Sequence, residues 1–389
     1  MVRSLTFFAC IVVLLSSCSF SKENSSGIRY DVDCTLRYCD ASVSEMQLSM
    51  LCDSIESIPL DTTGGFLLGR IEYVRFVHNH FFVLDDSDKL YVFDRSGHGS
   101  FILDRKGQGP HEYVDIHGFD VANDSSLCLL TYPPKLMYFD WNGTFVKEVR
   151  LANRGFELSL LSDDFAVLYR DNVGSTPDKA SFMLDVLHLP DETVSSHVAG
   201  YRFMAHRNLP AFQQRRALVD VAGGGCLFVP PLSNLVYSID KTGVHVKYML
   251  DFGSDNPPAD LTEQLPSSSL PSDFIADRFP VYGFNSCWEN SRYFYIQFYE
   301  HRQSRSLLYD KTVRKSYVGN FLNDDLTDCT PSFFMATEEA LIGYWTVDEI
   351  VSLGAFLEMR GKDKKPFFNT LLHQAESFGN PIMCLYHFK

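Results

Sequence analysis

The residues best suited to chemistry lie together in one glycine-rich segment, Arg105 to Tyr113 (RKGQGPHEY). Glycines beside cationic residues can cradle a phosphate group, because their backbone N–H groups approach an anion closely. This segment lacks both the Gly-Lys-Ser/Thr ending of a P-loop and the third glycine of a dinucleotide-binding turn. We therefore interpret it as a connecting turn. In the alternative interpretation it lines a pocket, with Arg105, His111, Glu112 and Tyr113 as candidate binding residues.

Two further clusters contain metal-ligating residue types. His78 and His80 are two positions apart, so in a strand both imidazoles would share one face. No Asp, Glu or His partner lies at a useful spacing near them, and a strand edge or turn explains the pair. The carboxylates of residues 85–88 (DDSD) could bind Ca²⁺, but they lack the EF-hand spacing and precede a hairpin. The sequence therefore predicts no metal site and no cofactor.

Motifs for hydrolysis are absent from the sequence. It contains no G-x-S-x-G elbow, and its carboxylates are too scattered to pair by sequence. It also has no C-x-x-C pair, so a zinc or redox motif is not supported. Aromatic residues at 293–295 and 298–299 could stack on sugar rings, although such alternating aromatics more often pack between sheets. We assign no catalytic residue, and an enzyme is the alternative to a non-enzymatic binding protein.

The composition is that of a folded, acidic protein. Of 389 residues, 45% are hydrophobic and 21% are charged, which excludes collagen-like, disordered and polytopic membrane classes. The 49 Asp and Glu residues outnumber the 34 Lys and Arg residues, giving a net charge of -15. Broad nucleic-acid binding needs basic residues that neutralise phosphates, so we expect no nucleic-acid partner.

The N-terminus has the pattern of an export signal. Arg3 precedes an apolar run, Leu5 to Leu15, that is shorter than the ~20 residues of a membrane-spanning helix. The following Leu-Ser-Ser-Cys resembles the lipobox of bacterial lipoproteins, which implies that Cys18 is acylated and becomes the mature N-terminus. An ordinary cleaved signal peptide is the alternative. Ser19 differs from the Asp of an inner-membrane retention signal, so we expect an outer-membrane anchor on the periplasmic or cell-surface side.

A repeated segment organises the rest of the chain. The copies are KLYVFDRSG (89–97), KLMYFDWNG (135–143), LHLPDET (187–193), LVYSIDKTG (235–243) and SLLYDKTV (306–313). Clear copies combine an alternating strand with Asp-x-x-Gly, in which Asp starts a type I turn and Gly supplies a positive φ. Further strand-like runs precede the copies, at 81–84, 127–131, 165–169, 226–229 and 293–298. About four short strands per ~45 residues indicate a β-propeller blade.

The sequence thus predicts an all-β, six-bladed β-propeller with a small helical insertion near the C-terminus. Five hairpins leave one blade for the two chain ends, and we expect the last strand, 381–388, to pair with an N-terminal strand and close the ring. Seven blades is the alternative count. The predicted divisions are a signal peptide over 1–17, a lipidated N-terminus and flexible tether over 18–40, and the propeller over 41–389.

Two stretches depart from the repeat. The Pro- and Ser-rich residues 257–273 indicate a long surface loop. In the second stretch Thr346 can cap a helix, and Ile350, Leu353 and Leu357 follow at helical spacing. This predicts a partly helical insertion at about 346–377, packed on one rim of the propeller.

Segment 105–113 also resembles the G-x-G-P-G-E-Y signature of six-bladed β-propeller lipoproteins of Bacteroidetes, a family similar to NHL-type propellers. The resemblance extends from about residue 53 to 389, and includes Asn380 to Met383 (NPIM) and the leader. His111 replaces the usual Gly between Pro and Glu of this signature, so the turn cannot rely on a free positive φ there. The resemblance implies the propeller fold and an envelope location, and little about function.

These observations predict a cell-envelope lipoprotein whose propeller face binds an oligosaccharide, a peptide or another envelope protein without catalysis. Membrane contact is expected through the lipid anchor only. One alternative is a glycan-active hydrolase or lyase, because a propeller assembles sites from several blades. The other is a purely scaffolding module.

Overall fold

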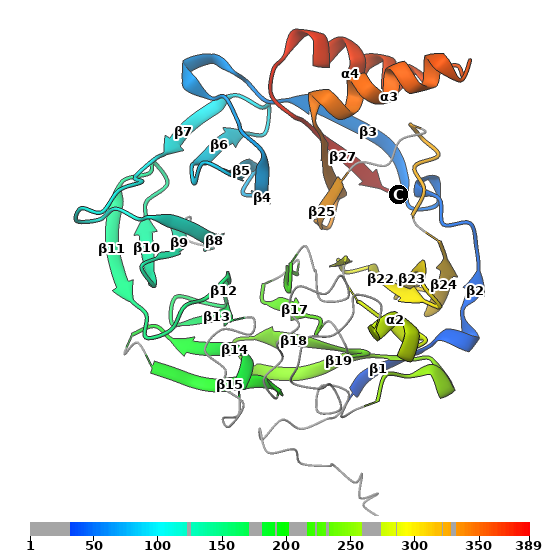
Figure 1. Cartoon of the computed structure of the whole chain (residues 1–389), viewed down its shortest axis with the longest axis horizontal. Coiled ribbons are helices and arrows are strands. Elements are labelled where there is room, and N and C mark those ends of the chain that lie inside the picture. Colours follow the sequence, from blue (N-terminus) through cyan, green and yellow to red (C-terminus); the bar gives the residue numbers. More distant parts are fainter. Residues whose placement is uncertain are drawn as a thin grey trace, which may run out of the picture.

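The computed structural model describes residues 32–122, 126–170, 181–190, 193–201, 216–221, 224–230, 233–258, 274–284, 286–320, 322–327 and 332–389. These residues form six sheets arranged around one axis (Figure 1). The protein is a six-bladed β-propeller, which confirms the predicted fold class and blade count.

Blades 1 to 3 follow one another along the chain, each with its first strand innermost (Figure 1). Blade 1 contains β4 (Ile71–Val77), β5 (His80–Asp85), β6 (Leu90–Asp94) and β7 (Gly99–Leu103). Blade 2 contains β8 (Asp115–Val121), β9 (Leu127–Tyr132), β10 (Lys135–Phe139) and β11 (Phe145–Arg150). Blade 3 contains β12 (Glu157–Leu160), β13 (Phe165–Tyr169), β14 (Ser181–His188) and β15 (Thr193–Tyr201).

Blades 4 to 6 also take up strands from the N-terminal segment. Blade 4 contains β16 (Leu218–Asp220), β17 (Cys226–Phe228), β18 (Leu235–Asp240), β19 (Gly243–Asp251) and β1 (Val32–Arg37). Blade 5 contains β20 (Val281–Tyr282), β21 (Cys287–Glu289), β22 (Tyr293–Glu300), β23 (Gln303–Asp310), β24 (Lys315–Gly319) and β2 (Ser42–Val43). Blade 6 contains β25 (Ser332–Ala336), β26 (Ala340–Trp345), β27 (Ile382–Phe388) and β3 (Cys52–Pro59).

The repeated Asp-x-x-Gly segments form the turns between the third and fourth strands, as predicted. In blade 1 the Asp94 carboxylate accepts the backbone N–H groups of Ser96 and His98, and Gly97 has a φ of 85°. The turns after β10 and β18 are built in the same way. The corresponding Asp191 lies outside the described residues, but its flanking strands β14 and β15 are paired.

The two ends of the chain close the ring together. The C-terminal β27 pairs with β26 on one side and with β3 on the other, with Met383 opposite Ile58. This confirms the predicted pairing of the last strand with an N-terminal strand. Because neighbouring blades pack on both faces of each sheet, this closure gives every blade two neighbours.

The N-terminal segment covers the outer edges of three consecutive blades. β1 pairs with β19 of blade 4 and β2 with β24 of blade 5, both in parallel, before β3 completes blade 6. β1 lies inside residues 18–40, which we expected to be a flexible tether. The structure corrects that boundary, because ordered pairing already begins at Val32.

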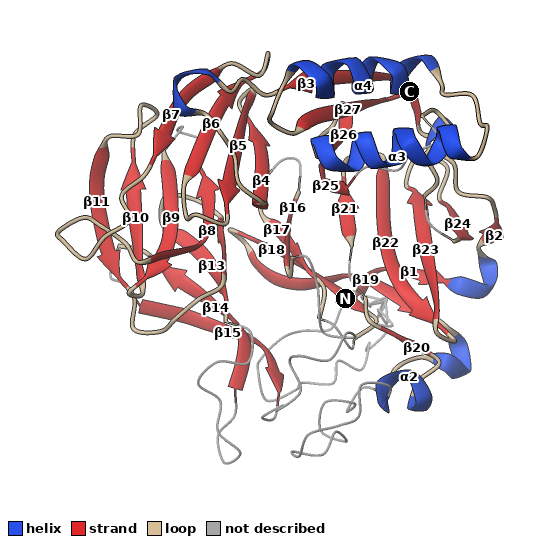
Figure 2. Ribbon diagram, turned by 45° about the horizontal axis from the view of Figure 1, so that its top comes forward, coloured by secondary structure: helices blue, strands red, loops and turns tan. Residues whose placement is uncertain are grey.

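Two helices form the predicted insertion between β26 and β27. They are α3 (Val347–Met359) and α4 (Pro366–Ser377), and they lie side by side along one rim (Figure 2). Thr346 caps α3 by accepting the Glu349 N–H, and the Glu349 carboxylate accepts the Thr346 N–H in return. The other short helices among the described residues are α2 (Phe274–Arg278) and the 3₁₀ turns at Tyr38–Asp40, Leu48–Met50, Thr63–Gly65 and Gly253–Asp255.

Aromatic side chains fill the spaces between blades. Tyr293, Phe294, Tyr295 and Phe298 of β22 are at most 3% exposed, so these rings belong to the core and are not available to stack on a sugar. Apart from Pro257 and Pro258, the predicted loop at 257–273 lies outside the described residues. Among the residues that are described, no helix is long and apolar enough to span a membrane.

Candidate binding pocket

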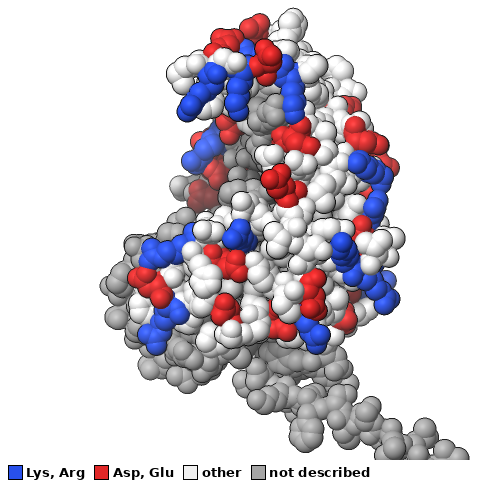
Figure 3. All heavy atoms as spheres, turned by 90° about the vertical axis from the view of Figure 1, so that its right-hand side faces the viewer, with Lys and Arg blue, Asp and Glu red and all other residues white. Residues whose placement is uncertain are grey.

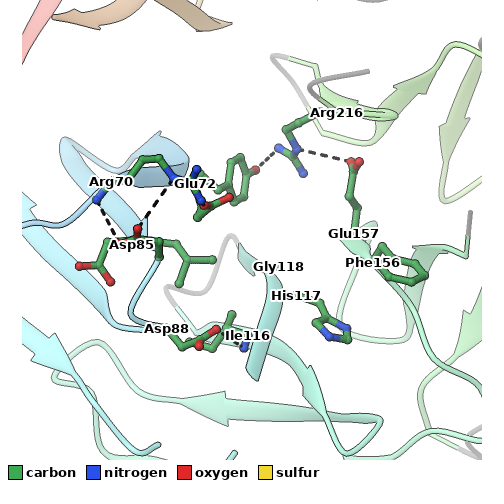
Figure 4. A pocket seen from close by; sticks show the side chains of 13 residues that line it. Arg70, Glu72, Asp85, Asp88, Ile116, His117, Gly118, Phe156, Glu157 and Arg216 are labelled. Atoms are coloured by element: carbon green, nitrogen blue, oxygen red, sulfur yellow. Dashed lines mark hydrogen bonds and ion pairs between the residues drawn. The ribbon is translucent and has the colours of Figure 1, made fainter. Parts of the chain in front are cut away.

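A pocket of about 380 Å³ opens beside the propeller axis, where the innermost strands of blades 1 to 3 begin. It is lined by Arg70, Glu72, Tyr73, Leu84, Asp85, Asp86, Asp88, Ile116, His117, Gly118, Phe156, Glu157 and Arg216. Figure 4 shows the labelled side chains arranged around one open space. Arg216 precedes β16, so four blades contribute to the lining. The carboxylates that are scattered along the sequence therefore converge in space.

The left-hand wall of the pocket in Figure 4 is held by the turn between β5 and β6. The Asp85 carboxylate, 3% exposed, accepts the backbone N–H groups of Gly69, Ser87 and Lys89. Asp86 accepts the Arg70 N–H at 3.1 Å, which ties the entry into β4 to the same turn. The sequence assigned this acidic cluster to turn chemistry, and the hydrogen bonds confirm that assignment. The same geometry also places its carboxylates in the pocket wall.

Glu157 and Arg216 form the opposite wall. The Glu157 carboxylate accepts the backbone N–H groups of Ala217 at 2.8 Å and Leu218 at 3.0 Å, so blade 3 is fastened to blade 4. The Arg216 Nε lies 3.5 Å from the same carboxylate. Burial raises the pKa of Glu157 above its ordinary value, although Arg216 opposes the shift. This carboxyl group therefore keeps a proton to higher pH than an exposed glutamic acid.

Arg216 also crosses the axis to blade 1. Its guanidinium lies over the Tyr73 ring, 3.8 Å from the centroid, and donates a hydrogen bond to the Tyr73 hydroxyl. Two residues further along β4, Arg75 forms ion pairs with Asp120 of blade 2 and, at 3.1 Å, with Asp220 of blade 4. These contacts join opposite sides of the ring beside the pocket.

The His117 ring lines the pocket, but both of its nitrogens already have hydrogen-bond partners. Its Nδ1 lies 2.8 Å from the Gly155 carbonyl oxygen, and its Nε2 lies 3.0 Å from Nη2 of Arg154. The ring stacks on Phe156, with centroids 5.6 Å apart and 12° between the planes. Burial lowers the pKa of His117, so the neutral ring is favoured near neutral pH. Both nitrogens are occupied, which disfavours a role as general base.

A family model described as a domain of unknown function, DUF4934, matches residues 32–387. The chain belongs to the DUF4934 family. No curated protein matches the DUF4934 chain significantly.

Solved structures show the propeller fold of the DUF4934 chain. A candidate exported protein from Bacteroides fragilis is similar with a TM-score of 0.72 and 17% identity, covering 92% of this chain and 100% of that one. Swd1 from Myceliophteria thermophila has a TM-score of 0.38 and 9% identity, with 74% of this chain and 96% of that domain covered. BamB from Moraxella catarrhalis has a TM-score of 0.37 and 12% identity, with 76% and 74% covered. Of these three, only the Bacteroides fragilis protein supports the fold, and at 17% identity its likeness shows the fold alone.

The four residues predicted from the sequence hold the connection from β7 to β8 of the DUF4934 chain. Tyr113 is fully buried, and its hydroxyl donates to the Asp88 carbonyl at 3.0 Å while accepting the Arg105 N–H at 3.1 Å. Glu112 accepts the Gly109 N–H at 2.7 Å. This is the crossover turn of the first interpretation. The 380 Å³ pocket is lined by other residues, and the binding role of these four stays a prediction.

His111 adopts a left-handed backbone conformation in this turn, with a φ of 60°. The family that this segment resembles has glycine at this position, and glycine adopts a positive φ without steric cost. His111 has the same backbone conformation but carries a side chain. The His111 ring packs on Phe145 with centroids 4.1 Å apart, and its Nδ1 lies 3.7 Å from the Glu148 carboxylate. These contacts stabilise His111 and so offset the cost of its left-handed backbone conformation.

The remaining candidate positions are explained by structure or lie outside the described residues. His78 and His80 flank the turn between β4 and β5 and both contact the edge of Trp141. Within the described part of the chain, no group of three or more His, Cys, Asp or Glu side chains could hold a metal ion. Cys18 is not among the described residues.

Sequence reasoning missed Glu72, Tyr73, His117, Glu157 and Arg216. These residues lie at or just before the start of an innermost strand, close to the axis. Their position along the chain was the signal that could have identified them. Charged residues at the start of the first strand of each blade lie at the same end of a propeller.

Proposed function

We propose that this DUF4934 protein is an exported, lipid-anchored envelope protein whose axial pocket binds a small polar ligand without catalysis. The observation that supports this most directly is the concave site itself, about 380 Å³ and lined from four blades. Concave sites of this size, in which a few polar groups converge, are typical of small-ligand binding. A pocket lined by several charged side chains also disfavours a purely scaffolding role.

The lining favours a ligand that donates hydrogen bonds. The pocket is lined by five carboxyl groups, those of Glu72, Asp85, Asp86, Asp88 and Glu157, and by two guanidinium groups, those of Arg70 and Arg216. Hydroxyl groups of an oligosaccharide or the ammonium group of a peptide would match this surface, whereas a polyanion would be repelled. The face in Figure 3 carries acidic and basic side chains interspersed, which gives no continuous basic track for a nucleic acid.

The state of the titratable groups supports binding over catalysis. His117 has both nitrogens engaged, and the Glu157 carboxylate already accepts two backbone N–H groups. A general base needs a free site within hydrogen-bond reach of its substrate. These side chains are instead fixed in place, as preformed binding groups are.

One observation favours a glycan-active hydrolase as the second candidate. Glycosidases pair a carboxylic acid of raised pKa with a second carboxylate. Glu157 has the raised pKa, and Glu72 lines the same pocket. Turnover of an oligosaccharide that is lost in both Glu157→Gln and Glu72→Gln would establish this function and overturn the non-enzymatic proposal.

The envelope location is supported by the leader sequence, in which a short apolar run ends at Cys18. Cys18→Ala should abolish the incorporation of a labelled fatty acid while the pocket keeps its affinity. Continued labelling of this variant would contradict lipidation at Cys18.

Ligand binding is tested by isothermal titration with two panels, neutral oligosaccharides and short peptides. We expect one panel to contain a ligand whose affinity falls at least about tenfold in Glu72→Gln, because one charged hydrogen bond is lost. Glu72 is half exposed and its ion pair is with Arg70, so the fold should tolerate this change. The matched control is Glu358→Gln, which changes an exposed carboxylate on α3. Binding that is equal in both variants would contradict the proposed site.

A further inference from the structure

Helix α3 carries apolar side chains on two opposite sides. Ile350, Gly354 and Leu357 are buried against the rest of blade 6 and α4. On the outward side, Val351 is 49% and Met359 is 75% exposed. Large apolar side chains that stay exposed on one helix mark a surface that a partner can cover. The outward side of α3 therefore points to a partner.

Three of the outward apolar residues form one row, and Phe356, 45% exposed, lies beside it. Val351, Ala355 and Met359 follow at intervals of four residues, so they lie one above another on the helix surface. We call this row the α3 stripe. All three are exposed, and the small Ala355 at its centre allows the backbone of another helix to approach closely.

Charged residues stand at the two ends of the α3 stripe. Asp348 lies in the first turn of α3, and Lys362 follows the Gly361 turn that ends it. Both are exposed, and within the described part of the chain neither side chain forms an ion pair. A free acidic group at the start of the helix and a free basic group at its end are complementary to the opposite ends of an antiparallel copy.

The α3 stripe is self-complementary about Ala355. Val351 and Met359 are equally distant from Ala355 in sequence, and so are Asp348 and Lys362. A two-fold axis at Ala355 would bring Val351 of one copy against Met359 of the other. It would also bring Asp348 near Lys362 of the second copy. In such an isologous contact both copies use the same surface patch, so the assembly ends at a dimer.

We infer that the α3 stripe is the contact between two copies of this chain, paired through antiparallel α3 helices. The stripe belongs to blade 6, whereas the pocket lining comes from blades 1 to 4 and their connections. The inference is therefore independent of the ligand proposed for the pocket.

Sedimentation equilibrium of the full-length protein in a mild detergent tests this contact. We expect a monomer–dimer equilibrium whose dissociation constant rises at least about tenfold in Met359→Lys, because a buried charge replaces an apolar contact. Val313→Lys is the matched control, since Val313 is 61% exposed on the turn after β23. A wild-type monomer at the highest concentration, or a dimer unaffected by Met359→Lys, would overturn the inference.

A charge exchange tests the antiparallel arrangement specifically. Asp348→Lys and Lys362→Asp should each weaken the dimer, and the double variant should restore it. Failure of the double variant to restore the dimer would overturn the two-fold pairing. A monomer that binds anionic phospholipid vesicles through Met359 would likewise overturn it, and would assign the α3 stripe to a membrane surface.

Discussion

Arg75 of blade 1 and Asp220 of blade 4 form an ion pair, with 3.1 Å between the guanidinium nitrogen and the carboxylate oxygen. The two blades are not neighbours in the ring (Figure 1), so the pair links opposite sides of the propeller. The two side chains are only 9% and 15% exposed. In such surroundings, removing one partner leaves the other charge buried and poorly compensated.

Arg75→Ala should therefore lower the free energy of unfolding by about 3–5 kcal/mol, measured by urea denaturation. The matched control is Arg302→Ala, which removes an exposed ion pair to Asp277 and should cost at most about 1 kcal/mol. Equal effects of the two substitutions would show that the cross-axis pair does not hold the ring together.

Leu36 tests whether the N-terminal strand is part of the folded propeller. Leu36 on β1 is 3% exposed and packs in the core of blade 4, so Leu36→Ala should cost about 2–5 kcal/mol through the cavity it leaves. Val43 on β2 is 92% exposed, and Val43→Ala should leave the urea midpoint almost unchanged. If both variants unfolded like the wild type, residues 32–37 would behave as a tether.

The terminal strand closes the ring, and its removal should abolish cooperative unfolding. Deleting residues 382–389 exposes the edges of both β26 and β3, which pair with β27 along its length. Removing Lys389 alone breaks its hydrogen bonds to Ser49, Leu51 and Arg292 and should preserve a single transition. Circular dichroism melting distinguishes the two, and an unchanged melt of the longer deletion would contradict closure by β27.

His117 should make stability depend on pH. Its pKa is lowered in the folded state, so the unfolded chain binds a proton more readily than the folded chain. The stabilisation is fully present above the ordinary histidine pKa of about 6.5 and is lost as the pH falls through the lower folded value. We expect the stability difference between the wild type and His117→Gln to shrink from pH 7.5 to pH 5. A constant difference over this range would contradict the burial of His117 as the cause.

The elements that depend on local chemistry were predictable from the sequence. An Asp-x-x-Gly turn needs only the Asp94 carboxylate and the backbone freedom of Gly97, so each hairpin is specified within a few residues. The cap of α3 at Thr346 is equally local. Repetition of such local signals then determined the blade count.

Contacts between distant segments were not predictable in this way. Tyr73, Glu157 and Arg216 meet because blades 1, 3 and 4 converge at the axis, and no spacing along the sequence encodes that meeting. The expected tether included β1 because its partner strand, β19, lies far away in sequence and pairs in parallel. The glycines around His111 suggested a binding loop in the sequence. In the structure they belong to the turn that connects β7 with β8.

The most direct test of the proposed binding function is a crystal structure of the protein soaked with the two ligand panels. We expect ligand density in the axial pocket, bounded by Glu72 and Tyr73 on one side and by Glu157 and Arg216 on the other. Density at a different surface, or a pocket that stays free of ligand at saturating concentrations of both panels, would contradict it.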